Sequence, residues 1–423
     1  MAEGRRRIAV VGAGVAGLTA AYILRNAHEV TLYDGDDRLG GHAHTHDVLS
    51  RDGRVHAVDS GFIVHNRRTY PHLLRLFREL GVSTQESEMS MSVRCDGCGL
   101  EYAGARGLPG LFAQPRNALR PAYLRMLAEV PAFHRAARRV LAAGSPGDPT
   151  LGEFLTAGRY SPYFVTHFMT PLVSAVWSCD ATDALRHPAR YLFRFLEHHG
   201  MLAVTGSPVW RTVTGGSRAY VERAAKQLPR VRTGDPVRFV RRLPGGGVEL
   251  GTEDGTTAPY DAVVIAVHAD QALRLLADPT AAERRVLGAF RYSRNPTVLH
   301  TDTGVLPRSR RARASWNYLL PSCDTPADRV RVSYDMNRLQ RLTAPETFVV
   351  TLNAEQRVAE AKVVARSTYE HPVFTQDSVA AQRELPDLSG PVTAFAGAYH
   401  GWGFHEDGCR SGVMAAAALG VTW

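Results

Sequence analysis

Three glycines near the start of the chain have the spacing of a turn that holds a pyrophosphate. Gly12, Gly14 and Gly17 form a GxGxxG sequence, with Ala13 and Ala16 between them. In such a turn the first glycine permits the tight bend, the second lets the backbone approach the ligand, and the third lets helix and strand pack closely. Free N–H groups at the start of the next helix stabilise the negative charge. The motif predicts a dinucleotide site.

The segments around the glycines match the elements that this site requires. Residues 7–11 form an apolar β run, residues 15–26 have helical periodicity, and residues 28–34 form a second β run. Asp34 ends that run roughly 20 residues after the first glycine, where an acid can accept hydrogen bonds from a ribose diol. The alternative interpretation is a glycine-rich turn in another α/β unit.

A second glycine pair indicates which dinucleotide is bound. The sequence directly after Asp34 contains a short polar and glycine-rich set, Gly35, Arg38, Gly40, Gly41 and His42. The two adjacent glycines would allow close backbone approach, with Arg38 and His42 near the phosphates. This pattern follows the fingerprint in one class of flavoproteins, and nicotinamide enzymes do not generally carry it. We therefore expect FAD as the cofactor.

With these motifs, the chain resembles the amine-oxidase-like FAD superfamily, which includes amine oxidases, phytoene-type desaturases and a fatty-acid double-bond isomerase. It is most similar to a bacterial group of FAD oxidoreductases linked to cyclopropane-fatty-acid-synthase-like lipid methyltransferases. The closer likeness lies in residues 58–82, 210–222, 261–273, 315–319, 333–340 and 401–408. The family usually has Glu at the Asp34 position and Arg or Lys at the His42 position, so this chain departs from the pattern twice.

The resemblance implies an α/β fold with two discontinuous parts. A Rossmann-like FAD-binding domain of the glutathione-reductase type would comprise residues 1–69, 212–285 and 386–423, and a mixed α+β substrate domain residues 70–211 and 286–385. Gly61, Phe62 and Val237 would contact the cofactor, the last through its backbone beside the adenine. Local patterns agree, because residues 117–143 and 151–200 look helical and several β runs lie between residues 295 and 351.

The resemblance also gives a role to the stretch FAGAYHGWGFHEDGCRSG at residues 395–412. A last strand at residues 392–397, ending at Gly397, would lead to the flavin, and a closing helix at residues 409–420 would begin beneath the flavin ring. N–H groups near Asp407, Gly408 and Gly412 would stabilise negative charge on the reduced ring. The pocket would be walled by three aromatic residues, Tyr399, Trp402 and Phe404. Relatives have an acid at the Ala398 position, for which Glu406 or Asp407 would substitute.

Hydride transfer to flavin N5 requires a group that manages a proton, and histidine titrates near neutral pH. Amine oxidases place a lysine on a strand that reads PTVLHTD here, so His300 is the first candidate for the acid/base, with His400 and Tyr399 as further candidates. The other interpretation of His300 is a half-buried ring that is satisfied by Asp302 or the backbone.

The missing lysine and the apolar residues 160–200 favour desaturation or double-bond isomerisation of a fatty-acyl or other hydrophobic substrate. Arginines in residues 116–139 and 308–313 would contact an anionic membrane, or simply form a solvated face. Two alternatives remain open. One is a flavin amine oxidase acting on a small natural product, and the other is a non-catalytic flavoprotein that serves a lipid methyltransferase partner.

The overall composition is that of a globular protein of two or three domains. The chain has 423 residues, of which 44% are hydrophobic and 22% charged, with a net charge of +9. No nucleic-acid-binding motif accompanies this charge, so we expect no nucleic-acid partner. No apolar run reaches the ~18 residues of a membrane span. We expect a cytoplasmic protein that is free to touch a membrane surface.

Five cysteines are too few, and odd in number, for a disulfide framework. Cys95 and Cys98 have CxxC spacing, but no second pair or neighbouring histidine in the sequence completes a zinc site, so we expect no metal. We interpret the pair as a tight turn between two strands, with a redox pair as the alternative.

Overall fold

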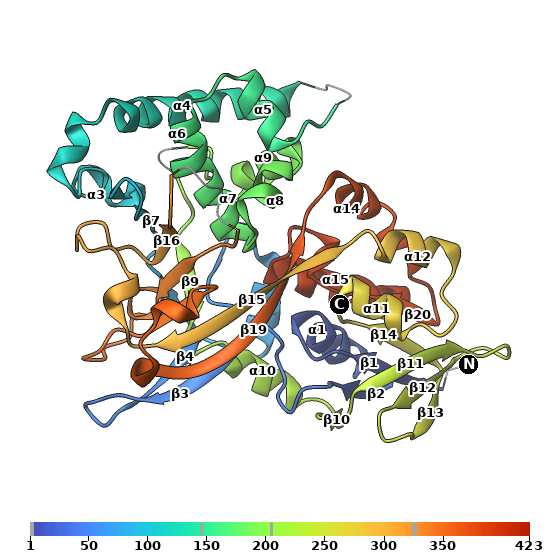
Figure 1. The fold of residues 1–423 in the computed structure, drawn as a ribbon. Helices are drawn as coiled ribbons and strands as arrows, with labels where there is room; N and C mark the ends of the chain where they lie inside the picture. The colour runs from blue at the N-terminus through green and yellow to red at the C-terminus, as the bar shows by residue number, and fades with distance from the viewer. Residues whose placement is uncertain (1–3, 144–146, 204–205, 324–327) are drawn as a thin grey trace.

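A five-stranded parallel sheet carries the glycine turn. The computed structural model describes residues 4–143, 147–203, 206–323 and 328–423 (Figure 1). Within them the strand order is β10-β2-β1-β14-β20. The strands are β1 (Arg7–Val11), β2 (Glu29–Tyr33), β10 (Arg230–Arg232), β14 (Ala262–Ile265) and β20 (Thr393–Phe395). All five come from the three segments assigned by sequence to the FAD-binding domain, and the central ones are continuous apolar runs, as buried parallel strands require.

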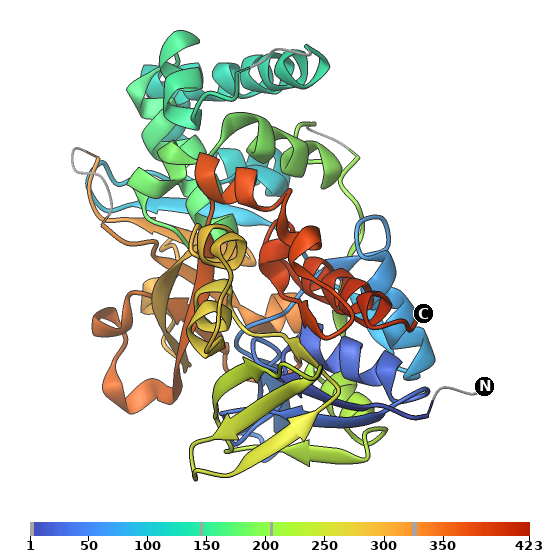
Figure 2. The ribbon, with the colours of Figure 1, turned by 90° about the vertical axis from the view of Figure 1, so that its right-hand side faces the viewer.

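Helices from opposite ends of the chain pack side by side next to this sheet. The helix α1 (Val15–Leu24) is buried along its whole length, and α15 (His405–Ala418) lies beside it (Figure 2). A Cβ on Gly412 would lie 2.4 Å from the carbonyl oxygen of Ala16, so the glycine permits the close approach. The closing helix thus begins at His405, ahead of the start at residue 409 that the sequence suggested.

A β meander and several shorter helices complete this part of the molecule. The meander contains β11 (Val237–Arg242), β12 (Val248–Thr252) and β13 (Thr257–Tyr260). The helices are α2 (Pro71–Glu79), α10 (Arg218–Ala225), α11 (Ala269–Leu275), α12 (Ala281–Leu287) and α14 (Gln376–Ala381).

A mixed seven-stranded sheet forms the second part, in the order β19-β15-β18-β17-β16-β7-β8. Its strands are β7 (Met91–Cys95), β8 (Glu101–Ala103), β15 (Arg291–His300), β16 (Trp316–Leu320), β17 (Val332–Asp335), β18 (Val349–Leu352) and β19 (Val363–Val373). The β runs between residues 295 and 351 are therefore strands, as predicted. The sequence interpretation missed β19, whose long antiparallel pairing with β15 crosses the middle of the molecule (Figure 1).

A helical lobe stands on this sheet, at the top of Figure 1. Its helices are α3 (Gly107–Leu111), α4 (Pro121–Ala142), α5 (Leu151–Ala157), α6 (Pro162–Phe164), α7 (Thr170–Trp177), α8 (Ala181–Arg186) and α9 (Ala189–His198). A π-helical turn, η3 (Val165–Met169), joins α6 to α7. Pro121 starts α4, where its missing N–H costs nothing, and Pro131 lies inside the helix without ending it.

A buried carboxylate fastens four segments together where the two parts meet. Asp59 ends β4 (Val55–Asp59), which pairs with β3 (Thr45–Leu49). Its oxygens accept hydrogen bonds from Thr45 Oγ1 at 2.6 Å, from Ser217 Oγ at 2.8 Å and from Gln340 Nε2 at 3.0 Å. Burial raises the pKa of Asp59 to about 6.

A second small sheet contains β5 (His65–Asn66), β9 (Trp210–Val213) and β6 (Thr84–Glu86). The short helix α13 (Met336–Gln340) carries Gln340, one of the partners of Asp59.

Candidate functional site

A single cavity of about 1510 Å³ extends between the parallel sheet and the helical lobe. This volume exceeds the usual range for one drug-sized ligand, about 300 to 1,000 Å³. One end is formed by the glycine turn, and the other by α7, α9 and β7. Of the residues proposed from sequence to bind the cofactor, those that line the cavity are Gly12, Ala13, Gly14, Ala16, Asp34, Gly35, Arg38, Gly41, His42, Gly61, Phe62, Val237 and Gly397.

The glycine turn has the geometry expected of its sequence. Gly12 has a φ of +99°, and a Cβ there would lie 2.6 Å from the carbonyl oxygen of Ala266. A Cβ on Gly17 would lie 1.8 Å from the Gly12 oxygen, so helix and turn pack too tightly for any side chain. At Gly14, a Cβ would meet no described atom within 4 Å apart from its chain neighbours. The open side of the turn therefore lies at Gly14, which caps α1.

Asp34 and Arg38 frame the turn in different ways. The carboxylate of Asp34 accepts hydrogen bonds from the N–H of Ala13 at 2.6 Å and of Asp36 at 2.9 Å, so it orders the turn itself. Burial raises the pKa of Asp34. Arg38 Nη1 is buried and has no hydrogen-bond partner among the described residues. A buried guanidinium nitrogen without a partner beside an open helix N-terminus fits a phosphate group.

The second glycine pair closes this end of the cavity. The N–H of Gly40 donates to the carbonyl of Ala13 at 2.9 Å, and a Cβ on Gly41 would lie 3.2 Å from Gly14 Cα. Gly40 thus supports the turn from behind, whereas Gly41 lines the cavity. The glycine turn, with Gly41 beside it, leaves space at Gly14 and has the unpartnered Nη1 of Arg38 nearby. This arrangement fits the diphosphate of FAD.

Three histidines from distant segments meet in the middle of the cavity. The ring of His42 lies 5.3 Å from that of His371 and 6.4 Å from that of His268, measured between centroids. Burial, reinforced by the neighbouring histidines, holds the pKa of His42 well below its usual range, and burial lowers that of His371 to about 4. At neutral pH the ring of His371 is therefore uncharged. His42 therefore does not act as the cationic phosphate partner that the sequence pattern suggested.

The aromatic residues of the C-terminal stretch form a wall of the cavity, as expected. Tyr399, Trp402 and Phe404 all line it. The carbonyl of Trp402 accepts a hydrogen bond from Trp177 Nε1 at 3.0 Å, and the ring of Phe404 stacks on Phe195 with centroids 5.0 Å apart. These contacts join the loop to helices α7 and α9. The hydroxyl of Tyr399 is buried and has no hydrogen-bond partner among the described residues.

The start of α15 is occupied by contacts within the protein. Asp407 accepts a hydrogen bond from the N–H of Phe404 at 3.1 Å, and burial raises the pKa of Asp407 to about 6. Glu406 accepts from the N–H groups of His72 and Leu73, so it caps α2. Neither acid is among the described residues that line the cavity. This corrects the expectation that one of them replaces the acid missing at residue 398.

Gly408 and Gly412 serve helix packing. A Cβ on Gly408 would lie 2.7 Å from Val15 Cγ1, and one on Gly412 would lie 2.4 Å from the carbonyl oxygen of Ala16. Both glycines face α1 and are absent from the described cavity lining. Cavity contact at the start of α15 is instead made by His405, whose ring stacks on Phe62 with centroids 3.6 Å apart.

His300 lies away from the cavity, which corrects the leading prediction for the acid/base. Its ring is fully buried, with Nε2 2.8 Å from Thr351 Oγ1. Its Nδ1 accepts a hydrogen bond from the N–H of Asp302 at 3.0 Å. Both ring nitrogens are thus used inside the protein, as the alternative interpretation proposed. His400 is likewise absent from the described lining, and burial lowers its pKa to about 4.

The far end of the cavity has a large apolar wall beside a polar edge at Ser87, Glu88 and Ser90. The wall is lined by side chains of α7 and its surroundings, Val64, Met89, Met91, Leu172, Ala175, Val176, Met201 and Trp316. The apolar helices between residues 160 and 200 therefore contribute a wall of the cavity as well as core. Exposed lining residues, Glu86 and Arg341, mark an opening at this end.

Sequence reasoning missed the residues that β19 and α11 bring to the cavity. Tyr369, Glu370 and His371 come from β19, and His268 caps α11. The β-branched and aromatic residues Val363, Val364, Thr368 and Tyr369 are a strand signal that could have found β19.

Comparisons with known proteins show the following similarities. A family model described as "Flavin containing amine oxidoreductase" matches residues 15–301. A Mycobacterium tuberculosis protein named as a flavin-containing monoamine oxidase is 32% identical over 281 residues, which are 64% of this chain and 59% of that protein. Carotenoid phi-ring synthase of Streptomyces griseus is 31% identical over 287 residues, 64% of this chain and 54% of the synthase. The chain therefore spans less than two thirds of the length of either relative.

Among solved structures, a CLA-producing fatty acid isomerase from P. acnes has the same fold. The TM-score is 0.68 at 17% sequence identity, and the match covers 96% of this chain and 97% of the isomerase. The expected combination of a Rossmann-like domain with a discontinuous mixed domain is thus confirmed at the level of fold.

Proposed function

The chain belongs to the flavin-containing amine oxidoreductase family, and from this premise we propose that it is an FAD-dependent oxidoreductase acting on a hydrophobic, fatty-acyl-like substrate. FAD is the cofactor that this membership implies, and when bound it accepts a hydride from a substrate C–H bond. The observation that carries the proposal is the continuity of one cavity from the glycine turn to an apolar end. A long hydrocarbon chain would fit that end better than a short polar molecule.

His371 is the residue that we propose to hold the proton. Its Nδ1 lies 3.1 Å from Asn295 Nδ2, and because an amide nitrogen only donates, Nδ1 accepts. The ring proton then resides on Nε2. Since burial keeps this ring neutral, its Nε2–H can donate a hydrogen bond that orients a reacting group of the substrate. Tyr399, which also lines the cavity and whose hydroxyl has no partner among the described residues, is the second group that we propose to orient a substrate.

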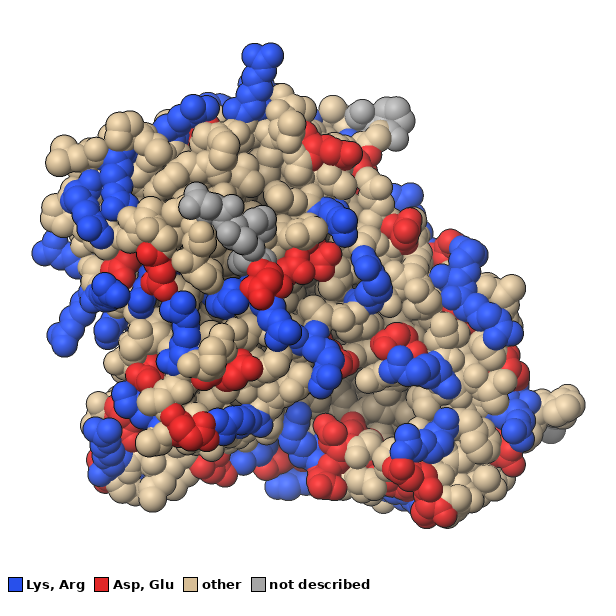
Figure 3. All heavy atoms as spheres, in the orientation of Figure 1, with Lys and Arg blue, Asp and Glu red and all other residues tan. Residues whose placement is uncertain are grey.

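Peripheral contact with an anionic membrane forms part of the proposal. Leu108, Leu119 and Leu124 are 70%, 85% and 42% exposed, and all belong to the stretch from α3 to α4. Ala105, just before this stretch, lines the cavity. Lys and Arg side chains spread over the left and upper parts of the face in Figure 3, which include this lobe. Exposed leucines among arginines suit a membrane surface.

Vesicle flotation tests the membrane contact. The protein should bind vesicles that contain phosphatidylglycerol and not vesicles of phosphatidylcholine alone. Leu108→Ser with Leu119→Ser should abolish binding, whereas Leu49→Ser, which removes an equally exposed leucine on β3, should not. Equal flotation of all variants would remove this part of the proposal. In the described residues, the structure contains no helix that is long and apolar enough to cross a membrane.

Amine oxidation is the second candidate function. The cavity wall contains aromatic faces from Trp177, Trp402 and Phe404, which attract cations. A curated relative is named as a monoamine oxidase. The positions of the lysines argue against amine oxidation. Amine oxidases place a lysine near the flavin, whereas neither Lys226 nor Lys362 is among the described residues that line this cavity.

Anaerobic incubation of the FAD-loaded protein with defined compounds separates the candidates. A desaturase would lose its yellow colour with long-chain acyl lipid, and an isomerase would keep its colour while mass spectrometry finds a shifted double bond. Bleaching by an aliphatic amine, with hydrogen peroxide on re-aeration, would replace the leading proposal with amine oxidation. A lipid methyltransferase partner that co-purifies while every lipid leaves the flavin unchanged would favour a non-catalytic flavoprotein.

A further inference from the structure

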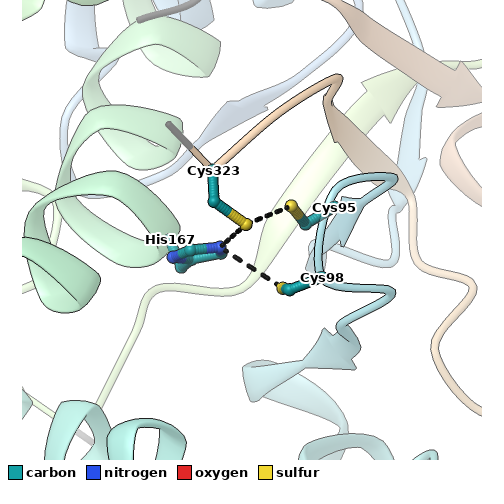
Figure 4. A group of neighbouring side chains, drawn as sticks. All are labelled: Cys95, Cys98, His167 and Cys323. Carbon is teal, nitrogen blue, oxygen red and sulfur yellow. Dashed lines mark hydrogen bonds between the residues drawn. The ribbon is translucent and has the colours of Figure 1, made fainter. Parts of the chain in front are cut away.

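Three cysteines and a histidine from separate segments converge at the base of the helical lobe (Figure 4). Cys95 ends β7, Cys98 lies in the turn between β7 and β8, and Cys323 follows β16. His167 comes from the π-helical turn η3. The sequence offered no histidine beside the CxxC pair, and the fold supplies one together with a third thiol. The expected tight turn between strands exists, and it is also half of this cluster.

The distances are those of a single tetrahedral ion. Cys98 Sγ and Cys323 Sγ lie 3.6 and 3.7 Å from His167 Nε2, and Cys95 Sγ lies 3.4 Å from Cys323 Sγ. All four atoms lie within 4.8 Å of one another. Tetrahedral Zn²⁺, with bonds of about 2.3 Å to sulfur and 2.0 Å to nitrogen, separates sulfur from nitrogen by about 3.5 Å and two sulfurs by about 3.8 Å. We propose that Cys95, Cys98, His167 and Cys323 bind a structural Zn²⁺ ion.

The surroundings of His167 orient it as a ligand. Its Nδ1 lies 3.2 Å from the carbonyl oxygen of Tyr163, to which it donates its proton, so the lone pair of Nε2 points toward the sulfurs. The ring of Tyr163 stacks on the imidazole with centroids 4.0 Å apart. The histidine is also 1% exposed and lies in a π turn, a conformation found often at functional sites.

The CxxC turn is built for close approach and for negative charge. A Cβ on Gly97 would lie 2.9 Å from the backbone nitrogen of Cys323 and 3.2 Å from its sulfur, so only glycine lets the two segments meet. Arg120 Nη2 donates to the carbonyl of Cys98 at 3.1 Å, and Arg116 Nη2 donates to that of Gly99 at 2.8 Å. Two guanidinium groups thus contact the backbone of the turn that carries Cys95 and Cys98, whose thiols must be thiolates to bind zinc. A surface hollow that reaches His167 and Cys323 gives the ion a path of entry.

Four protein ligands leave no open position, which is the arrangement of a structural site. The ion would join the β7–β8 turn, the end of β16 and the helical lobe. In the sequence, Cys98 and His167 are 69 residues apart, and Cys95 and Cys323 are 228 residues apart. A clip across such long loops stabilises the folded chain. His167 also directly precedes α7, which carries Leu172 and Val176 into the apolar end of the cavity. Zinc would therefore fix that wall.

The metal content of the full-length protein tests the site. Protein purified in reductant with FAD should contain about one zinc per chain. After chelation and addition of Co²⁺, it should show the visible absorption of tetrahedral thiolate-bound cobalt beyond the flavin bands. Thermal stability should fall on chelation and return with zinc. A metal-free, stable protein whose thiols are all free would overturn the proposal, and so would a Cys95–Cys323 disulfide detected by mass.

Matched variants locate the ion. Cys323→Ser and His167→Gln should lose most of the zinc, whereas Cys179→Ala, which removes a buried thiol outside the cluster, should keep it. If a ligand variant does not fold, the cobalt spectrum and zinc content of the wild-type protein still decide. Zinc retained in full by both folded ligand variants would refute the assignment.

Discussion

A Cβ on Gly17 would lie 1.8 Å from the carbonyl oxygen of Gly12, whereas a Cβ on Gly14 would meet open space. The two glycines of one motif therefore carry different constraints. Gly17→Ala should fail to fold or lose several kcal/mol of stability, because backbone must move. Gly14→Ala should fold normally and bind FAD weakly, because the methyl group would occupy the approach to the pyrophosphate. Circular dichroism measures folding, and the absorbance of bound flavin measures FAD content. A Gly14→Ala protein with full FAD content would contradict the assignment of the glycine turn as the pyrophosphate site.

Arg38 supplies the second prediction for the cofactor. Arg38→Ala should weaken FAD binding about 10- to 100-fold, because a charge-assisted contact is worth roughly 1.5–3 kcal/mol. Arg285→Ala is the control, since that guanidinium pairs with Glu384 on the surface at 2.6 Å. Flavin fluorescence titration of the apoprotein measures the two affinities. Equal affinities would mean that the buried Nη1 of Arg38 has another use.

His300 should matter for stability and not for turnover. His300→Ala should lower the free energy of unfolding by about 2–4 kcal/mol, because it leaves a buried hole, removes one of the partners of Thr351 Oγ1 and leaves the N–H of Asp302 without its acceptor. His371→Ala should keep the flavin and lose turnover. Urea unfolding and flavin reduction rates separate the two variants, and the reverse pattern would restore the assignment made from the sequence.

The apolar end of the cavity should select chain length. Val176→Trp should exclude long acyl chains while leaving short ones and FAD content unaffected, because the bulky ring fills only the end lined by α7. Val173→Ile, a change on the buried side of the same helix, is the control. Reduction rates for substrates of increasing length give the comparison, and a uniform loss for all lengths would show that the end does not hold the substrate.

Stability should fall as the pH drops from about 6.5 to about 4. Burial lowers the pKa of His65, His187 and His300 to about 4, so the unfolded chain binds more protons in this window. The stabilisation is complete above the unfolded pKa and is lost toward the folded one, at about 1.4 kcal/mol per pH unit and ring. Asp59 and Asp407, each with a pKa raised to about 6, oppose this trend.

The measurement is urea unfolding of the FAD-free protein across that range. None of the three histidines is among the described cavity residues, so the result does not depend on the cofactor. An unfolding free energy that rises on acidification would mean that the two carboxyl groups dominate.

Local signals predicted the first part of the fold well. One short stretch of sequence contains the glycine turn, its flanking strands and Asp34. The steric and electrostatic constraints on these residues come from neighbours in the same stretch, so they can be seen in the sequence. His300 was chosen from its position along a strand of the family pattern, and such a position does not fix the face on which the side chain lies, because one residue of register reverses it. The Cys–His cluster was invisible because His167 is 69 residues from Cys98 in the chain.

The ribbon of β15 and β19 has a consequence for how a ligand enters. The two strands pair along their whole length, from Arg291 opposite Val373 to His300 opposite Val363. The pairing is interrupted only by a bulge between Leu299 and His300. Tyr292, near one end, accepts a hydrogen bond from the N–H of Ala269 at 3.0 Å and so is tied to the nucleotide-binding half. Swinging the halves apart would break the hydrogen bond between Ala269 and Tyr292 at the end of this ribbon. Substrate exchange should therefore proceed by small side-chain rearrangements at the cavity opening, with the two halves staying docked throughout the catalytic cycle.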